Sequence, residues 1–101
     1  MEIETPVVHM GRPHDVYIGR PSVWGNPYSH QVRTQAKFVV ATREEAIAKY
    51  ESYIRSTPEL LRRLPELRGK RLGCWCAPFP CHGDVLVKLL VEMDAGTLAI
   101  P

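Results

Sequence analysis

The clearest periodic pattern of apolar residues lies in the middle of the chain. These residues recur at three- and four-residue steps, at Ala46, Ile47, Tyr50, Tyr53 and Ile54. Such spacing is typical of an amphipathic helix that lies on a sheet. Thr42 and Glu45 form a capping box, in which the Thr42 oxygen accepts from the third helical amide and the Glu45 carboxylate accepts from the Thr42 amide. We therefore predict a helix over residues 43–55.

Two further segments carry helical signals. Thr57 and Pro58 form a start signal, with proline at the first helical position. The leucines that follow predict a short helix over residues 58–66, which Pro65 disturbs. Apolar residues between Val85 and Met93 recur at helical spacing and predict a helix over 83–95, ending near Gly96.

Short runs of β-branched, aromatic and apolar residues predict the strands. They lie at residues 5–10, 15–20 and 71–76, and the first two are separated by a turn at 11–14. Residues 21–37 contain two prolines and no sustained period, so they predict a long loop of a kind that is often functional. The order of elements predicts an α/β fold. It would be one domain over residues 1–101, a two- or three-layer sandwich with a mainly parallel sheet of about three to five short strands.

Composition narrows the class of protein. The 101-residue chain has a net charge of +2, which does not favour nucleic acid as a partner. No apolar run approaches the roughly 20 residues that cross a bilayer, and the start, MEIETPVVHM, does not resemble a secretory signal. We expect a cytoplasmic protein without a membrane partner. A domain this small often completes its pocket across a symmetric dimer, so a homodimer is a further expectation.

The three cysteines lie together between Cys74 and Cys81, which indicates a site or a metal rather than a disulfide framework. They lie in a loop between a predicted strand and the last helix, where α/β folds generally bind ligands. Free amides near His82, Gly83 and Asp84 would favour an anion there. The same helix end would lower the pKa of Cys81, so Cys81 or Cys76 could act as a nucleophile while His82 or Asp84 handles protons.

A metal is the competing interpretation of this loop. Thiolate and imidazole groups are the ligands that zinc takes in tetrahedral sites, and the candidates are Cys74, Cys76, Cys81 and His82. The C-x-C spacing differs from the C-x-x-C hairpin of standard zinc knuckles, although Cys74 and Cys76 would share a strand face. We expect no cofactor from this spacing, with zinc or an iron–sulfur centre as the alternative.

The predicted loop after residue 20 supplies a second set of candidates. Arg20 ends a predicted strand, where a guanidinium can bind phosphate in a bidentate manner. Trp24 either packs in the core or stacks on a flat ring such as a nucleobase. Gly25 and Asn26 form a tight turn with Pro27, and the asparagine serves either the turn itself or recognition of a base.

Two segments, YIGRPSVWGNPY at 17–28 and GKRLGCWCAPFPCHGDVL at 69–86, resemble a bacterial and phage family known as a domain of unknown function. The paired motifs of that family read IGRPSxWGNPY and GCWCxPxPCHGD. The resemblance spans roughly residues 15–90 and implies that Arg20, Trp24, Gly25, Asn26, Cys74, Trp75, Cys76, Pro78, Cys81 and His82 are motif positions. The layout also looks like a compact Rossmann-like nucleotide-binding domain, without its glycine-rich phosphate loop.

These observations predict a protein that binds, or also processes, a small phosphorylated nucleotide-derived ligand at the carboxyl ends of the strands. A phage version would sequester a host immune signal. Two alternatives stay open: a cysteine-dependent enzyme of nucleotide or base metabolism, and an interaction module stabilised by a Cys/His metal site. The predicted ligand-binding residues are Gly19, Arg20, Trp24, Gly25, Asn26, Trp75, Cys76, Pro78, Cys81, His82, Gly83 and Asp84.

Overall fold

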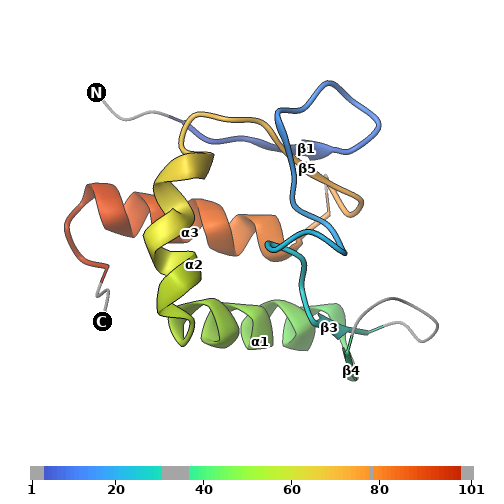
Figure 1. The fold of residues 1–101 in the computed structure, drawn as a ribbon. Coiled ribbons are helices and arrows are strands. Elements are labelled where there is room, and N and C mark those ends of the chain that lie inside the picture. The colour runs from blue at the N-terminus through green and yellow to red at the C-terminus, as the bar shows by residue number, and fades with distance from the viewer. Residues whose placement is uncertain (1–3, 31–36, 78, 99–101) are drawn as a thin grey trace.

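The computed structural model describes residues 4–30, 37–77 and 79–98. Its elements follow one another as β1 (Val7–His9), β2 (Val16–Tyr17), β3 (Tyr28–Ser29), β4 (Phe38–Val39), α1 (Arg43–Arg55), α2 (Pro58–Arg63), a 3-10 helix (Leu64–Leu67), β5 (Leu72–Cys74) and α3 (His82–Asp94). Figure 1 shows their arrangement. The structure confirms a small α/β fold with parallel strands in small sheets and three α-helices.

The strands form two small parallel sheets. In the larger sheet β5 lies between β1 and β2, and Leu72 pairs with Val7 on one side and Val16 on the other. The second sheet pairs β3 with β4. Because β1, β2 and β5 run in the same direction, their carboxyl ends meet at one edge, and the chain segments that follow Tyr17 and Cys74 leave the sheet there.

Two helices begin with side-chain caps. The Thr42 hydroxyl accepts a hydrogen bond from the Glu45 amide at 3.0 Å, which confirms the predicted start of α1 at Arg43. The Glu45 carboxylate accepts from the Ala41 amide at 3.2 Å instead of the predicted Thr42 amide. Cys81 caps α3, where its sulfur accepts from the Gly83 amide and the Asp84 carboxylate accepts from the Cys81 amide. Around Pro65 the chain adopts a 3-10 helix instead of continuing α2, because proline cannot supply the amide that the α-helix needs.

The core lies between the larger sheet and the helices. Figure 1 shows α3 between the β1–β5 region and α1, and α3 contacts both β1 and α1. The largest fully buried side chains come from all of these parts: Ile18, Tyr50, Ile54, Leu61, Leu64, Leu67, Leu72, Leu86, Leu89 and Cys74. The apolar face predicted for α1 is only partly buried, since Ala46, Tyr50 and Ile54 are buried while Ile47 and Tyr53 are intermediate.

Several boundaries differ from the sequence predictions. The strand expected at 15–20 ends at Tyr17, since the chain then leaves the sheet toward the cavity described below. The region predicted as a loop over 21–37 contains β3, whose Tyr28 ring stacks on Phe38 of β4 with centroids 5.0 Å apart. The helix predicted over 58–66 ends at Arg63. Among the described residues, no helix has the length and apolar character needed to cross a membrane.

Candidate functional site

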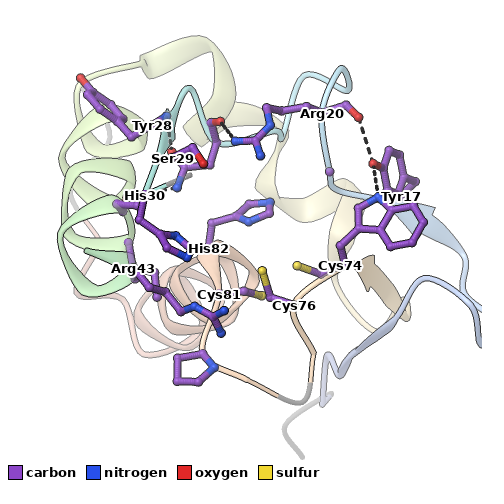
Figure 2. A pocket seen from close by; sticks show the side chains of 16 residues that line it. Tyr17, Arg20, Tyr28, Ser29, His30, Arg43, Cys74, Cys76, Cys81 and His82 are labelled. Carbon is purple, nitrogen blue, oxygen red and sulfur yellow. Dashed lines mark hydrogen bonds between the residues drawn. The ribbon is translucent and has the colours of Figure 1, made fainter. Parts of the chain in front are cut away.

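A cavity of about 300 Å³ opens where the chain leaves the carboxyl ends of β2 and β5. The start of α3, the start of α1 and the β3 region complete its wall, so segments far apart in sequence meet there (Figure 2). Its lining residues are Tyr17, Gly19, Arg20, Asn26, Tyr28, Ser29, His30, Arg43, Ala46, Ile47, Cys74, Trp75, Cys76, Pro80, Cys81 and His82.

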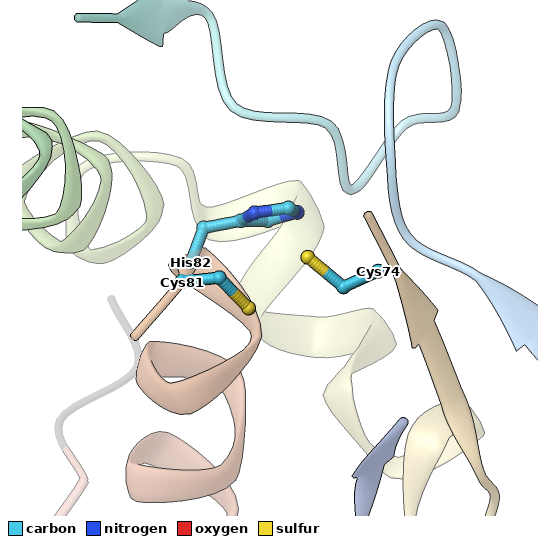
Figure 3. A group of neighbouring side chains, drawn as sticks. All are labelled: Cys74, Cys81 and His82. Atoms are coloured by element: carbon cyan, nitrogen blue, oxygen red, sulfur yellow. The ribbon is translucent and has the colours of Figure 1, made fainter. Parts of the chain in front are cut away.

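Two cysteines and a histidine form a tight cluster within this wall. Cys74 ends β5, while Cys81 and His82 begin α3, and their side chains point toward one shared space (Figure 3). One potential ligand atom from each of the three residues lies within 4.8 Å of the other two. All three side chains are buried. The cluster therefore joins the sheet edge to the start of the helix.

The three thiols differ in acidity. The hydrogen bond from Cys74 lowers the pKa of Cys81, and the Gly83 amide lowers it further against the opposing effect of burial. Cys76 lowers the pKa of Cys74 through its hydrogen bond, but the bond to Cys81 and burial outweigh this and raise that pKa to about 11. The bond to Cys74 and burial raise the pKa of Cys76. Cys81 is thus the thiol that ionises first.

His82 is held as a neutral imidazole. Burial lowers its pKa more than the hydrogen bond to the Ile18 carbonyl raises it, and the charge of Arg20 lowers it further. Its Nε2 lies 2.7 Å from the Ile18 oxygen. Because a carbonyl only accepts, Nε2 carries the proton and Nδ1 carries the lone pair. Tyr50 packs edge-to-face on the ring, with centroids 4.9 Å apart.

Two arginines reach the cavity from different elements. Arg20 follows β2 and donates a hydrogen bond to the Asn26 carbonyl at 2.9 Å. Arg43 is the first residue of α1, and its guanidinium lies 5.5 Å from the centre of the Phe79 ring. In Figure 2 the thiols and His82 lie between the two guanidinium groups. Both positive charges also act on Cys76, where each lowers the thiol pKa.

A fixed aromatic side chain forms part of the rim. Trp75 is 62% exposed, yet its indole nitrogen donates to the Tyr17 hydroxyl at 3.0 Å and its ring meets His9 edge-on. The Tyr17 hydroxyl donates in turn to the Arg20 carbonyl at 2.9 Å. This chain of bonds holds the indole beside the arginine that enters the cavity.

Asn26 has a structural role at the cavity wall. Its amide nitrogen donates to the Ala46 carbonyl of α1 and its oxygen accepts from the Tyr28 amide. Both groups of this buried side chain therefore have partners. Asn26 ties β3 to α1, and its own carbonyl orients Arg20.

The structure brings most of the sequence candidates together. Gly19, Arg20, Asn26, Trp75, Cys76, Cys81 and His82 line the cavity, as does the metal candidate Cys74. Trp24 instead lies in the core at 3% exposure, where its carbonyl accepts from the Tyr50 hydroxyl. Gly25 borders a neighbouring hollow. Gly83 packs on Ile18 and Val7, and Asp84 caps α3. Pro78 lies outside the described residues.

Sequence reasoning missed several lining residues, chiefly Arg43, His30, Tyr28 and Tyr17. Arg43 offered a signal, because a positive charge in the first turn opposes the helix dipole. Tyr17 lay within the strand predicted at 15–20, which leads directly into a loop that carries site candidates. His30 and Tyr28 carried no such signal, since only the folded chain places the β3 region against α1.

The fold and the cavity define a small α/β protein with an arginine-flanked Cys/His pocket at a parallel sheet edge. Residues 6–92 match the family described as Domain of unknown function (DUF4326), and the chain belongs to this family. It is similar to Uncharacterized protein R718 of Acanthamoeba polyphaga mimivirus, with 36% identity covering 82% of this chain and 74% of that protein.

A second relative comes from Enterobacteria phage T4. It is the Uncharacterized 12.4 kDa protein in the nrdA-td intergenic region, 33% identical over 75% of this chain and 67% of its own length. No solved structure gave a significant match. Relatives of this chain therefore occur in viruses of both bacteria and amoebae.

Proposed function

We propose that the cavity binds a small phosphorylated, nucleotide-derived ligand. The observation that carries this proposal is the pair of arginines, Arg20 and Arg43, that flank one cavity from two different elements. Guanidinium groups are well suited to phosphate because their donors match two oxygens at once. The anion would lie between them, above the cysteine and histidine side chains.

The position of Arg43 supports a role beyond folding. A cation at the first position of a helix meets the positive end of the helix dipole, which disfavours it by a few tenths of a kcal/mol or more. Contact with Phe79 offsets part of this effect. An anionic ligand would offset it more fully, because it would bring a negative charge to the same helix end.

The volume of the cavity and the aromatic residue at its rim indicate what the ligand contains besides phosphate. A volume of about 300 Å³ is at the lower end for small-molecule sites, which favours a single nucleotide unit over a dinucleotide. Trp75 provides a held, exposed aromatic ring at the rim, and such rings stack on bases. The predicted resemblance to Rossmann-like nucleotide-binding domains supports a nucleotide ligand by analogy.

Calorimetric titration of the metal-free protein would test this proposal. The probes are the four common nucleoside 5′-monophosphates, with the matching nucleosides and inorganic phosphate for comparison. We expect at least one monophosphate to bind about tenfold or more tightly than its nucleoside, a difference of about 1.4 kcal/mol. Arg20→Gln and Arg43→Gln should each remove most of that difference.

Lys49→Gln is the matched control, since it removes the same charge from an exposed position on α1. It should bind the monophosphate as the unaltered protein does. If no phosphorylated probe binds, or if the arginine variants bind like the control, the pocket does not recognise phosphate in the way proposed.

A cysteine-dependent enzyme of nucleotide or base metabolism is the second candidate. It is favoured by the position of Cys81, whose sulfur accepts the Gly83 amide and borders the same cavity as both arginines. Product analysis after long incubation with a binding nucleotide separates the two functions. Turnover that disappears in Cys81→Ser supports the enzyme, whereas recovery of the ligand intact supports binding alone.

The viral relatives suggest a setting for this activity. A small cytoplasmic protein that holds a nucleotide without releasing it could remove a host immune signal during infection. Measuring how slowly the bound nucleotide dissociates tests this role, because a sequestering protein needs slow release.

A further inference from the structure

We propose that Cys74, Cys81 and His82 form a three-ligand Zn²⁺ site whose fourth position opens into the cavity. This inference goes beyond the proposed binding of a phosphorylated ligand and does not depend on it. It rests on three buried side chains from two elements whose ligand atoms converge within 4.8 Å (Figure 3). Two thiolates and one imidazole are a ligand set that zinc takes in open sites.

The distances require only a small adjustment. Bonds of about 2.3 Å to sulfur and about 2.0–2.1 Å to nitrogen place tetrahedral ligand atoms roughly 3.5–3.8 Å apart. Contraction from the present spacing is therefore on the order of 1 Å. Rotation about the side-chain torsions of Cys74 and Cys81 is the motion that would bring the two sulfur atoms closer.

Neighbouring groups already support the ligands in the way that metal sites require. Nε2 of His82 donates to the Ile18 carbonyl, which fixes the tautomer and leaves Nδ1 with the lone pair that a metal needs. The Gly83 amide donates to the Cys81 sulfur at 3.3 Å, and an amide donor of this kind stabilises a metal-bound thiolate. Binding of the metal through Nδ1 is compatible with the bond from Nε2 to the Ile18 carbonyl.

Charge favours two thiolate ligands over three. Zn²⁺ with two thiolates is electrically neutral, so Arg20 and Arg43 would still make the cavity positive. Adding the Cys76 thiolate would leave a net negative charge at the floor of an arginine-flanked pocket. Cys76 is also less buried than Cys74 and Cys81. It is hydrogen-bonded to Cys74 but does not belong to the group of three ligand atoms that all lie within 4.8 Å of one another. We therefore assign the fourth position to water or to a ligand in the cavity.

This assignment changes the role of Cys81. A metal-bound thiolate is no longer a free nucleophile, so the zinc site and the cysteine nucleophile of the second candidate exclude one another. Binding of an anion by Arg20 and Arg43 is compatible with the zinc site and with the cysteine nucleophile, because neither arginine is a metal ligand. Titration with monophosphate before and after zinc loading therefore tests the two proposals separately.

The experiment uses the whole chain, purified under reducing conditions, stripped with a chelator and reloaded with Zn²⁺ or Co²⁺ alone. We expect one metal ion per chain by native mass spectrometry. The Co²⁺ form should show thiolate-to-metal charge transfer and the visible bands of four-coordinate cobalt. Cys74→Ser, Cys81→Ser and His82→Gln should each lower metal affinity by tenfold or more. Cys76→Ser should retain one ion, because the open site assigns Cys76 no bond to the metal.

Alkylation of the unaltered protein avoids reliance on variants that fold poorly. Zinc loading should slow the alkylation of Cys74 and Cys81 relative to the metal-stripped protein and leave the rate at Cys76 unchanged. Absence of stoichiometric metal, or a Cys74–Cys81 disulfide that persists under these conditions, overturns the proposal. Loss of metal in Cys76→Ser, or slower alkylation of all three cysteines on zinc loading, overturns the open site, because the cluster would then be a closed four-ligand site.

Discussion

Helices α1 and α3 are both 13 residues long and begin with a side-chain cap, but the two caps differ in chemistry and surroundings. Thr42 caps α1 at the surface with a hydroxyl, which is a preferred group at this position. Cys81 caps α3 in a buried setting with a sulfur atom, which is a weaker acceptor. The first arrangement is sufficiently explained by helix stability.

The second cap is not explained by helix stability alone. A serine at position 81 would accept the Gly83 amide at least as well as the cysteine does. The sulfur instead lies beside Cys74 and His82 on the wall of a cavity. The contrast between the helices therefore supports our proposal that Cys81 serves the chemistry of the cavity as well as the start of α3.

The largest expected effect on stability comes from the residue at the second position of each helix, because this residue is packed closely in α3 and exposed in α1. A Cβ at Gly83 would lie 2.9 Å from Ile18 Cδ1 and 3.0 Å from Val7 Cγ1. Gly83→Val should lower the free energy of unfolding by about 1–3 kcal/mol through overpacking, measured by urea denaturation. Glu44 holds the same position in α1 and is exposed. Glu44→Val should therefore change the free energy of unfolding by about 0.5 kcal/mol or less. Equal losses would show that the two helix starts are not packed differently.

A smaller effect is expected at the surface cap. Thr42→Ala removes the acceptor of the Glu45 amide and should lower the free energy of unfolding by about 1 kcal/mol. Thr42→Ser keeps the hydroxyl and should behave as the unaltered protein in the same urea titration. Neither variant should change metal content or nucleotide affinity. A change in ligand binding would mean that the start of α1 contributes more to the cavity than Arg43 alone.

The sequence was sufficient for the elements whose signals are local. The capping box at Thr42 and Glu45 predicted the start of α1, and apolar periodicity predicted α3 to within a residue or two. Strand β3 was not predicted, because two residues that pair only through a distant partner carry no periodic signal.

The site shows the same division between local and distant information. Cys74, Cys81 and His82 were candidates because they are close in sequence. Their spacing gave no reason to expect a convergent cluster, since it depends on where β5 ends relative to the start of α3. His30 lines the cavity only through the packing of the β3 region, which residue patterns do not encode. Arg43 carried one local signal, a positive charge at the first position of a helix, but its place in the cavity also depends on how α1 packs.

Cys81→Ser should have the smallest effect on stability but a large effect on metal binding. Cys81→Ser keeps a side chain of similar shape and supplies a preferred cap for the Gly83 amide. The better cap should offset part of the cost of placing a hydroxyl in this buried setting. We therefore expect the free energy of unfolding of the metal-free protein to fall by less than the about 1 kcal/mol expected for Thr42→Ala. Metal binding, measured on the same samples, should nevertheless fall by tenfold or more. If Cys81→Ser instead unfolds more readily than Thr42→Ala while keeping its metal, the sulfur serves packing. The difference between the two helix caps would then reflect burial alone.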